Sequence, residues 1–261
     1  MALLEMTFAA NTLERWTEAT VILPVESAGP VPVQKPEKFP TLYLLHGYSG
    51  NSKDWLTYSN IRGLAEAHNL AVVMPSGENG FYVDNPEFSL HYGQFIRELV
   101  DFTRKMFPLS DKREDTFIAG LSMGGFGAMR NGFANNDLFG KIGALSGAYI
   151  LEDIIGLKEG ERSGIADYGY YRRVFGDLQT VMESDSNPLV CAANAKSTGT
   201  LPDVFMACGT EDFVIENNRR MRDGLEKLGI PFQYHEGPGI HDWKFWGEWL
   251  PKLVDWLMEV K

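Results

Sequence analysis

Residues 116–127 read Thr-Phe-Ile-Ala-Gly-Leu-Ser-Met-Gly-Gly-Phe-Gly, and no other segment says as much about the fold. A short apolar run leads into Gly120-x-Ser122-x-Gly124, and small residues and helix formers follow. This order predicts a strand, a tight turn and a helix, with Ser122 strained at the apex. Glycines are expected there because a Cβ would clash where strand and helix nearly touch. Ser122 is therefore a candidate nucleophile facing a helix N-terminus.

The pentapeptide alone is a weak signal, because an ordinary glycine-rich turn can contain it by chance. Its context favours the nucleophile, since similar apolar runs recur along the chain. We predict strands at 17–25, 41–45, 70–74, 116–121, 141–145, 203–208 and 231–235, and helices at about 54–67, 91–107, 123–135, 215–228 and 243–259. Strands that alternate with helices predict an α/β fold with a mostly parallel central sheet and helices on both faces. Function is then expected at the carboxyl ends of the strands.

Two segments depart from this alternation. Residues 28–40 contain four prolines and are interpreted as a loop. Residues 147–200 are too long for a crossover between two strands, and their pattern indicates helices and loops without a strand. We interpret the chain, 1–261, as one domain in which 147–200 is a candidate lid over Ser122; a decorative surface excursion is the alternative.

The composition narrows the function classes. A formal charge of −11 argues against nucleic acid and anionic membranes as partners. The first residues lack the basic segment of a signal peptide, and no apolar run is long enough to span a bilayer. The two cysteines, Cys191 and Cys208, are expected to be buried thiols in a reducing compartment. We therefore expect a cytoplasmic protein.

A serine nucleophile needs a base, and the base needs an acid that orients it. In an α/β-hydrolase these follow in the order serine, acid, histidine. His241, in a loop after the last predicted strand, is the better candidate base, because His235 lies within that strand and is interpreted as structural. The acid should follow the strand at 203–208, where Asp212 is preferred and Glu211 is the alternative. Either carboxylate could instead cap the next helix.

The negative oxygen of a tetrahedral intermediate needs preorganised donors. One candidate is the backbone N–H of Met123, directly after the nucleophile. The second should come from the loop after the strand at 41–45, where Gly47 lets the backbone turn inward and the N–H of Tyr48 is the candidate. His46 in the same loop is interpreted as a scaffold residue.

Four aromatic residues adjoin these motifs: Phe81, Tyr82, Trp243 and Trp246. An acyl pocket should be largely apolar, although core packing is the alternative for each ring. Trp243 is the foremost candidate for the substrate pocket because it follows His241 by two residues.

Several motifs occur together in one order. They are Leu45-His46-Gly47-Tyr48-Ser49-Gly50-Asn51, Asn79-Gly80-Phe81-Tyr82, residues 120–128, Cys208-Gly209-Thr210-Glu211-Asp212-Phe213 and Pro238-Gly239-Ile240-His241-Asp242-Trp243. With them the chain resembles the esterase D family of α/β-hydrolases, and most of all its bacterial tributyrin esterases. The resemblance implies a carboxylesterase for short-chain acyl esters, without a cofactor or metal. It implies the same triad, Ser122, Asp212 and His241, and the same oxyanion donors, Tyr48 and Met123.

Members of the family act on different substrates, so the resemblance does not identify the substrate of this chain. Relatives of the family include S-formylglutathione hydrolases, feruloyl and acetyl-xylan esterases and mycolyl transferases. Leu121 stands where many formylglutathione hydrolases carry histidine, which counts against that thioesterase. An acyltransferase and a hydrolase-like binding protein are further alternatives. The family resemblance also favours a homo-oligomer that acts on a small-molecule acyl ester.

Overall fold

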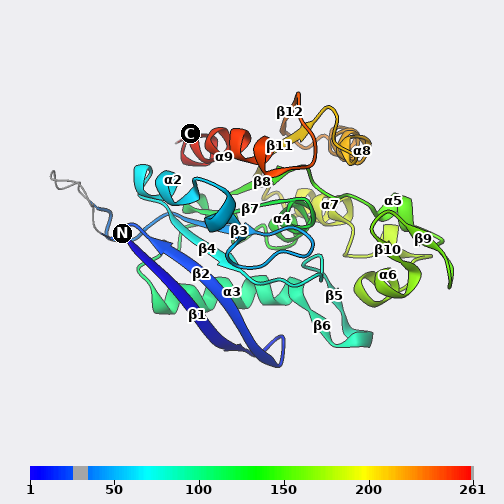
Figure 1. Ribbon diagram of the computed structural model, residues 1–261, viewed down its shortest axis with the longest axis horizontal. Coiled ribbons are helices and arrows are strands. Elements are labelled where there is room, and N and C mark those ends of the chain that lie inside the picture. The colour runs from blue at the N-terminus through cyan, green and yellow to red at the C-terminus, as the bar shows by residue number, and fades with distance from the viewer. Residues whose placement is uncertain (26–34, 260–261) are drawn as a thin grey trace.

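The computed structural model describes residues 1–25 and 35–259. Its centre is an eight-stranded sheet in the order β1-β2-β4-β3-β7-β8-β11-β12 (Figure 1). The strands are β1 (Ala2–Ala10), β2 (Arg15–Leu23), β3 (Thr41–Leu45), β4 (Ala71–Pro75), β7 (Thr116–Leu121), β8 (Lys141–Leu145), β11 (Asp203–Gly209) and β12 (Gln233–Gly237). From β4 to β12 all neighbours pair in parallel, whereas β2 pairs antiparallel with both β1 and β4.

Helices cover both faces of the sheet. Alternate residues of β3 show this: Tyr43 and Leu45 join one apolar core, and Leu42 and Leu44 join the other. On the first face pack α3 (Tyr92–Met106), α4 (Met123–Ala134), α7 (Pro188–Thr198) and α8 (Ile215–Lys227). On the second pack α1 (Asp54–Tyr58), α2 (Ile61–Ala67) and α9 (Trp243–Met258). The predicted α/β-hydrolase fold is confirmed.

The order of the strands determines where a ligand site is expected in the sheet. The chain leaves β3 for β4 on one side and later returns to β7 on the other side of β3. This reversal creates a switch point between β3 and β7, where α/β sheets bind their ligands. The loop after β3 and the turn after β7 meet at this point, and both carry predicted site residues.

Three elements differ from the sequence prediction. Residues 2–10, to which no strand was assigned, form β1 and pair along their whole length with β2. The helix predicted over 54–67 is two helices, because the hydroxyl of Ser59 donates to Trp55 O and accepts from Ile61 N. Such local side-chain bonds compete with a continuous helix. The loop prediction for 28–40 lies largely outside the described residues.

The third correction concerns residues 147–200, predicted to lack strands. They contain α5 (Leu151–Ile154), a short hairpin of β9 (Arg162–Ser163) and β10 (Ala166–Asp167), α6 (Tyr168–Phe175) and α7. Gly164 adopts φ +53° at the hairpin turn, and two-residue strands leave no alternation to detect. The segment also contains a 3₁₀ turn at Val181–Glu183. Elsewhere lie a second small hairpin, β5 (Asp84–Asn85) and β6 (Leu90–His91), and 3₁₀ turns at Pro86–Phe88 and Arg113–Asp115.

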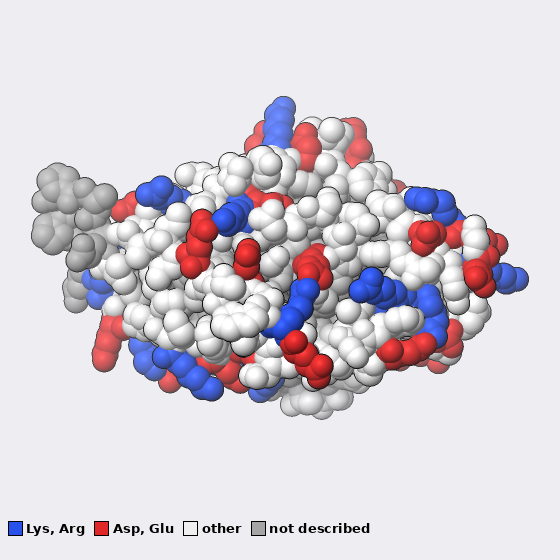
Figure 2. Space-filling model, turned by 60° about the horizontal axis from the view of Figure 1, so that its bottom comes forward, with Lys and Arg blue, Asp and Glu red and all other residues white. Residues whose placement is uncertain are grey.

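The surface carries mixed charges. On the face shown in Figure 2, Lys and Arg side chains are interspersed with Asp and Glu. Ion pairs such as Arg15–Glu78 and Arg172–Glu87 join the two signs. Within residues 1–25 and 35–259, no helix combines the length and apolar character needed to cross a bilayer.

Candidate active site

Ser122 lies on a sharp turn between β7 and α4. Its backbone has φ 52° and ψ −119°, a strained conformation for a residue with a side chain. A Cβ built on Gly124 would lie 2.6 Å from His46 O, and one built on Gly120 would lie 2.9 Å from Gly124 Cα. Both contacts are far inside van der Waals distance. The strand–turn–helix expected at residues 116–127 is therefore present, with its glycines at the crowded points.

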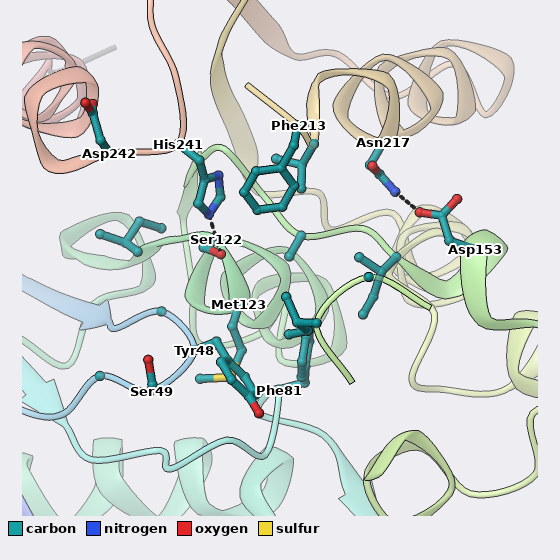
Figure 3. A pocket seen from close by; sticks show the side chains of 18 of the residues that line it. Tyr48, Ser49, Phe81, Ser122, Met123, Asp153, Phe213, Asn217, His241 and Asp242 are labelled. Atoms are coloured by element: carbon teal, nitrogen blue, oxygen red, sulfur yellow. Dashed lines mark hydrogen bonds between the residues drawn. The ribbon is translucent and has the colours of Figure 1, made fainter. Parts of the chain in front are cut away.

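His241 links Ser122 to Asp212 through hydrogen bonds. Figure 3 shows the bond between His241 and Ser122. Its Nε2 lies 2.8 Å from Ser122 Oγ, and its Nδ1 lies 2.9 Å from each carboxylate oxygen of Asp212. A carboxylate can only accept, so Nδ1 carries the proton and Nε2 accepts from the serine hydroxyl. Ser122, His241 and Asp212 thus have the arrangement of nucleophile, base and orienting acid.

The structure separates the two candidate acids. Asp212 is buried, and its Oδ1 also accepts from Val214 N at 3.0 Å. Glu211 is exposed and contacts the histidine loop instead, with Oε2 accepting from Gly239 N at 2.7 Å. That N–H, followed by the Thr210 hydroxyl, lowers the pKa of Glu211. Glu211 therefore braces the loop that carries His241, while Asp212 contacts the imidazole.

The two predicted oxyanion donors lie on the opposite side of Ser122 from His241. Met123 begins α4, and the first N–H groups of a helix have no partner within it. A Cβ built on Gly47 would lie 3.5 Å from Ser122 Cβ, so the loop after β3 passes directly over the nucleophile. Tyr48 follows in this loop, and Tyr48 and Met123 line the pocket together with Ser122 (Figure 3).

A pocket of about 660 Å³ opens at Ser122. Its walls are mostly apolar, as expected for an acyl ester site. They include Phe81, Ile150, Ile154, Ile165, Tyr171, Phe213, Trp243 and Trp246, with Asp153 and Asn217 at one end. Trp243 and Phe81 thus lie where the sequence analysis expected them. Tyr82 is not part of the lining, because its ring is fully buried and its hydroxyl donates to His46 O at 3.2 Å.

Several lining residues were missed from the sequence. Phe213 directly follows Asp212, and its ring centroid lies 4.4 Å from that of His241 although 72% of the residue is exposed. An exposed aromatic beside a candidate acid was the available signal. Ile150, Ile154, Ile165 and Tyr171 come from 147–200, where no sequence pattern marked individual residues.

His235 and His46, which the sequence predicted to be structural, both pack among other side chains or loops. His235 lies within β12, between the rings of Phe205 and Trp249. His46 is buried, its Nε2 accepts from Gly77 N at 2.8 Å, and its Nδ1 therefore donates to Gly47 O at 2.7 Å. Burial lowers the pKa of both imidazoles. Neither ring contacts Ser122.

Both cysteines are buried free thiols. Burial raises the pKa of Cys208 to about 12, which disfavours a nucleophilic thiolate. Among the described residues no group of three or more His, Cys, Asp or Glu side chains is placed to hold a metal ion.

A sequence model of the Esterase family matches residues 10–257. The chain belongs to the Esterase family. This esterase is 43% identical to an acetyl esterase of Caldicellulosiruptor saccharolyticus over 266 residues, covering 100% of this chain and 99% of the relative. Its family, this relative and the likeness to a serine hydrolase of known structure, described next, make it a serine ester hydrolase.

Two solved structures from Staphylococcus aureus resemble this esterase over 99% of both chains. One is the fluorophosphonate-binding serine hydrolase FphF, at 29% identity and a TM-score of 0.85. The other is the S-formylglutathione hydrolase FrmB, at 28% identity and a TM-score of 0.83. Both likenesses extend from end to end, so residues 147–200 are included in the shared fold.

Proposed function

We propose that this esterase hydrolyses short-chain acyl esters with Ser122 as nucleophile, His241 as base and Asp212 as orienting acid. The observation that carries the proposal is the continuous hydrogen-bond chain from Asp212 through His241 to Ser122 Oγ. Likeness to an acetyl esterase of nearly the same length supports a small acyl group. The motif resemblance to esterase D and bacterial tributyrin esterases agrees with this substrate class.

The geometry supports the following reaction. Ser122 Oγ attacks the ester carbonyl carbon while His241 Nε2 takes the hydroxyl proton, and the N–H groups of Tyr48 and Met123 stabilise the oxyanion. Collapse of the tetrahedral intermediate breaks the bond to the alkoxy oxygen, which receives the proton from His241. Water then attacks the acyl-enzyme with His241 again as base, and releases the carboxylic acid and free Ser122. No cofactor takes part in these steps.

The pocket suggests how the substrate is held. Trp243 lines the pocket next to the histidine loop in sequence, and residues 147–200 supply a further wall through Ile150, Ile154 and Ile165. We therefore assign 147–200 the role of a lid that bounds the pocket within a single domain.

A thioesterase of the S-formylglutathione type is the second candidate, favoured by the likeness to FrmB. The acyl-enzyme chemistry is the same for an oxyester and a thioester. Leu121, which lines the pocket next to the nucleophile, counts against it, because many of those enzymes carry histidine there. Feruloyl and acetyl esterase activities differ from the main proposal only in the acyl group.

The test is hydrolysis of p-nitrophenyl acetate, butyrate and octanoate by the unmodified chain and by Ser122→Ala, with S-formylglutathione and a butyryl thioester in parallel. We expect turnover to decrease from the shorter esters to octanoate and to vanish in Ser122→Ala. Faster turnover of the thioesters would favour the second candidate. Turnover that survives in a folded Ser122→Ala would overturn both.

A further inference from the structure

Asn79 belongs to a motif of the family resemblance, yet it lies outside the triad and does not line the pocket. It sits in the loop of residues 77–82, which follows β4 and runs beside the loop after β3. We call residues 46–49 the oxyanion loop because Tyr48 is the proposed donor. The two loops are distant in sequence and are joined by three hydrogen bonds.

These three bonds bracket Tyr48. On its upstream side Gly77 N donates to His46 Nε2 at 2.8 Å, and Tyr82 OH donates to His46 O at 3.2 Å. On its downstream side Ser49 N donates to the side-chain Oδ1 of Asn79 at 2.7 Å. The Tyr48 N–H belongs to the preceding peptide unit and the Ser49 N–H to the following one. Because His46 on one side and Ser49 on the other are held by these bonds, rotation of the backbone at Tyr48 is limited.

Asn79 is itself held in place. The backbone carbonyl oxygen of Asn79 accepts from the hydroxyl of Tyr170 on α6 at 2.6 Å. The ring of Tyr170 also meets the ring of Tyr48 edge-on, with centroids 5.7 Å apart. Residues 147–200 therefore contact both the oxyanion loop and the residue that braces it.

The loop of residues 77–82 is strained, and its neighbours maintain the strain. Glu78, Phe81 and Tyr82 all have positive φ, between 46° and 56°. Such conformations are unfavourable for residues with a side chain and persist only where surrounding contacts fix them. Here the carbonyl of Tyr82 accepts from Asn131 Nδ2 at 2.8 Å, and Glu78 accepts from the Tyr92 hydroxyl at 2.6 Å.

We propose that Asn79 is a positioning residue for the oxyanion hole, because its side-chain oxygen holds Ser49 N–H and thereby aims the Tyr48 N–H at the developing oxyanion. The inference rests on the proposed function, in which Tyr48 is a donor. Donors act only when they are fixed before the charge develops. Loss of the Asn79 oxygen should therefore slow the chemical step and leave substrate binding nearly unchanged.

The test compares Asn79→Ala, Asn79→Asp and Asn136→Ala with the unmodified chain, using p-nitrophenyl butyrate. Asn79→Ala should lower kcat by about tenfold to a hundredfold, with KM within about twofold. Asn79→Asp keeps an acceptor oxygen for Ser49 N and should recover most of kcat. Asn136 is the matched control, since its side chain also bonds a distant loop, at Thr198 and Thr200, away from the pocket.

A second readout separates oxyanion stabilisation from general damage. An alkyl trifluoromethyl ketone forms a tetrahedral adduct with the serine, whereas the matching methyl ketone reports binding without the charged oxygen. Asn79→Ala should weaken inhibition by the trifluoromethyl ketone by the same factor as kcat and leave the methyl ketone unchanged. Thermal unfolding checks the fold. Asn79→Ser, whose hydroxyl is too short to reach Ser49 N, replaces the alanine variant if that variant does not fold.

Three outcomes would overturn the inference. The first is an unchanged kcat in folded Asn79→Ala, and the second is equal weakening of both ketones. The third is Asn79→Asp losing as much kcat as Asn79→Ala. In all three, turnover that depends on Ser122 would leave the proposed function standing. Absence of such turnover in the unmodified chain would instead overturn the proposed function and the inference together.

Discussion

The strand-end loops and residues 147–200 meet at one pocket but are held in different ways. The loops that carry Ser122, Asp212 and His241 leave parallel strands and are fixed by backbone and buried contacts, such as Ser122 N donating to Leu145 O at 2.9 Å. Residues 147–200 are joined to neighbouring loops by side-chain bonds, such as Tyr170 OH donating to the backbone oxygen of Asn79 at 2.6 Å. The rate of the catalytic steps should therefore depend on the strand-end loops. The preference for substrates of a given acyl length should depend on the wall that residues 147–200 form.

The largest expected effect lies within the loops. Asp212→Asn should lower kcat by about 10⁴-fold, because an amide no longer holds the Nδ1–H tautomer of His241. Glu211→Gln should lower it by less than about tenfold, since Glu211 braces the loop without contacting the imidazole. Steady-state kinetics with p-nitrophenyl butyrate measures both. Comparable losses in the two variants would contradict the assignment of Asp212 as the orienting acid.

The close packing under the loops gives the next effect. Gly124→Ala places a Cβ against His46 O and should lower the free energy of unfolding by about 1–3 kcal/mol, with loss of activity as the turn shifts. Gly247 on α9 is the matched control, since a Cβ there meets nothing within 4 Å. Gly247→Ala should stabilise the protein by about 0.5–1 kcal/mol. Denaturant unfolding measures the free energy of unfolding of both variants. An unchanged value for Gly124→Ala would show that the strand–helix contact tolerates a side chain.

The fold and the loop residues were predictable because each has a local signature. The apolar run at 116–121 and the glycines around Ser122 predict the turn, and the order of Asp212 and His241 follows the strand order. The structure brings these three side chains together, and the variants test their roles. β1 was missed although Leu4-Glu5-Met6-Thr7-Phe8 alternates apolar and polar residues, because its pairing with β2 is seen only in the folded sheet. Asn79 escaped because its contact with Ser49 spans 30 residues and depends on a strained loop.

Two isoleucines in residues 147–200 allow a paired test of whether this wall of the pocket selects substrates by acyl length. Ile165 and Ile155 both lie in 147–200 with 45% and 46% exposed, but only Ile165 of the two lines the pocket. Ile165→Ala should lower kcat/KM for p-nitrophenyl octanoate by about three- to tenfold, since lost apolar contacts weaken binding of the longer chain. The same variant should leave p-nitrophenyl acetate within twofold, and Ile155→Ala should leave both esters unchanged. Equal losses for acetate and octanoate would remove the size-selecting role proposed for this wall.

The smallest effect is a pH dependence of stability that arises from His46 in the oxyanion loop; none of the five histidines lies in 147–200. Burial lowers the pKa of His46 in the folded protein. Below about pH 6.5, His46 is therefore protonated in the unfolded chain while it stays neutral in the folded protein. Stability is thus complete above about pH 6.5 and falls as the pH drops toward the folded pKa.

His46→Gln keeps an acceptor for Gly77 N–H without a titrating group, so its stability should fall less between pH 7 and 5.5. Urea unfolding at several pH values measures the difference, and His235→Gln serves as the comparison because burial also lowers the pKa of His235. If His46→Gln and the unmodified chain lose stability in parallel, protonation of His46 does not disturb the oxyanion loop. If only His46→Gln shows a smaller loss of stability than the unmodified chain, protonation of His46 accounts for the difference, and acid acts on the loop that carries Tyr48.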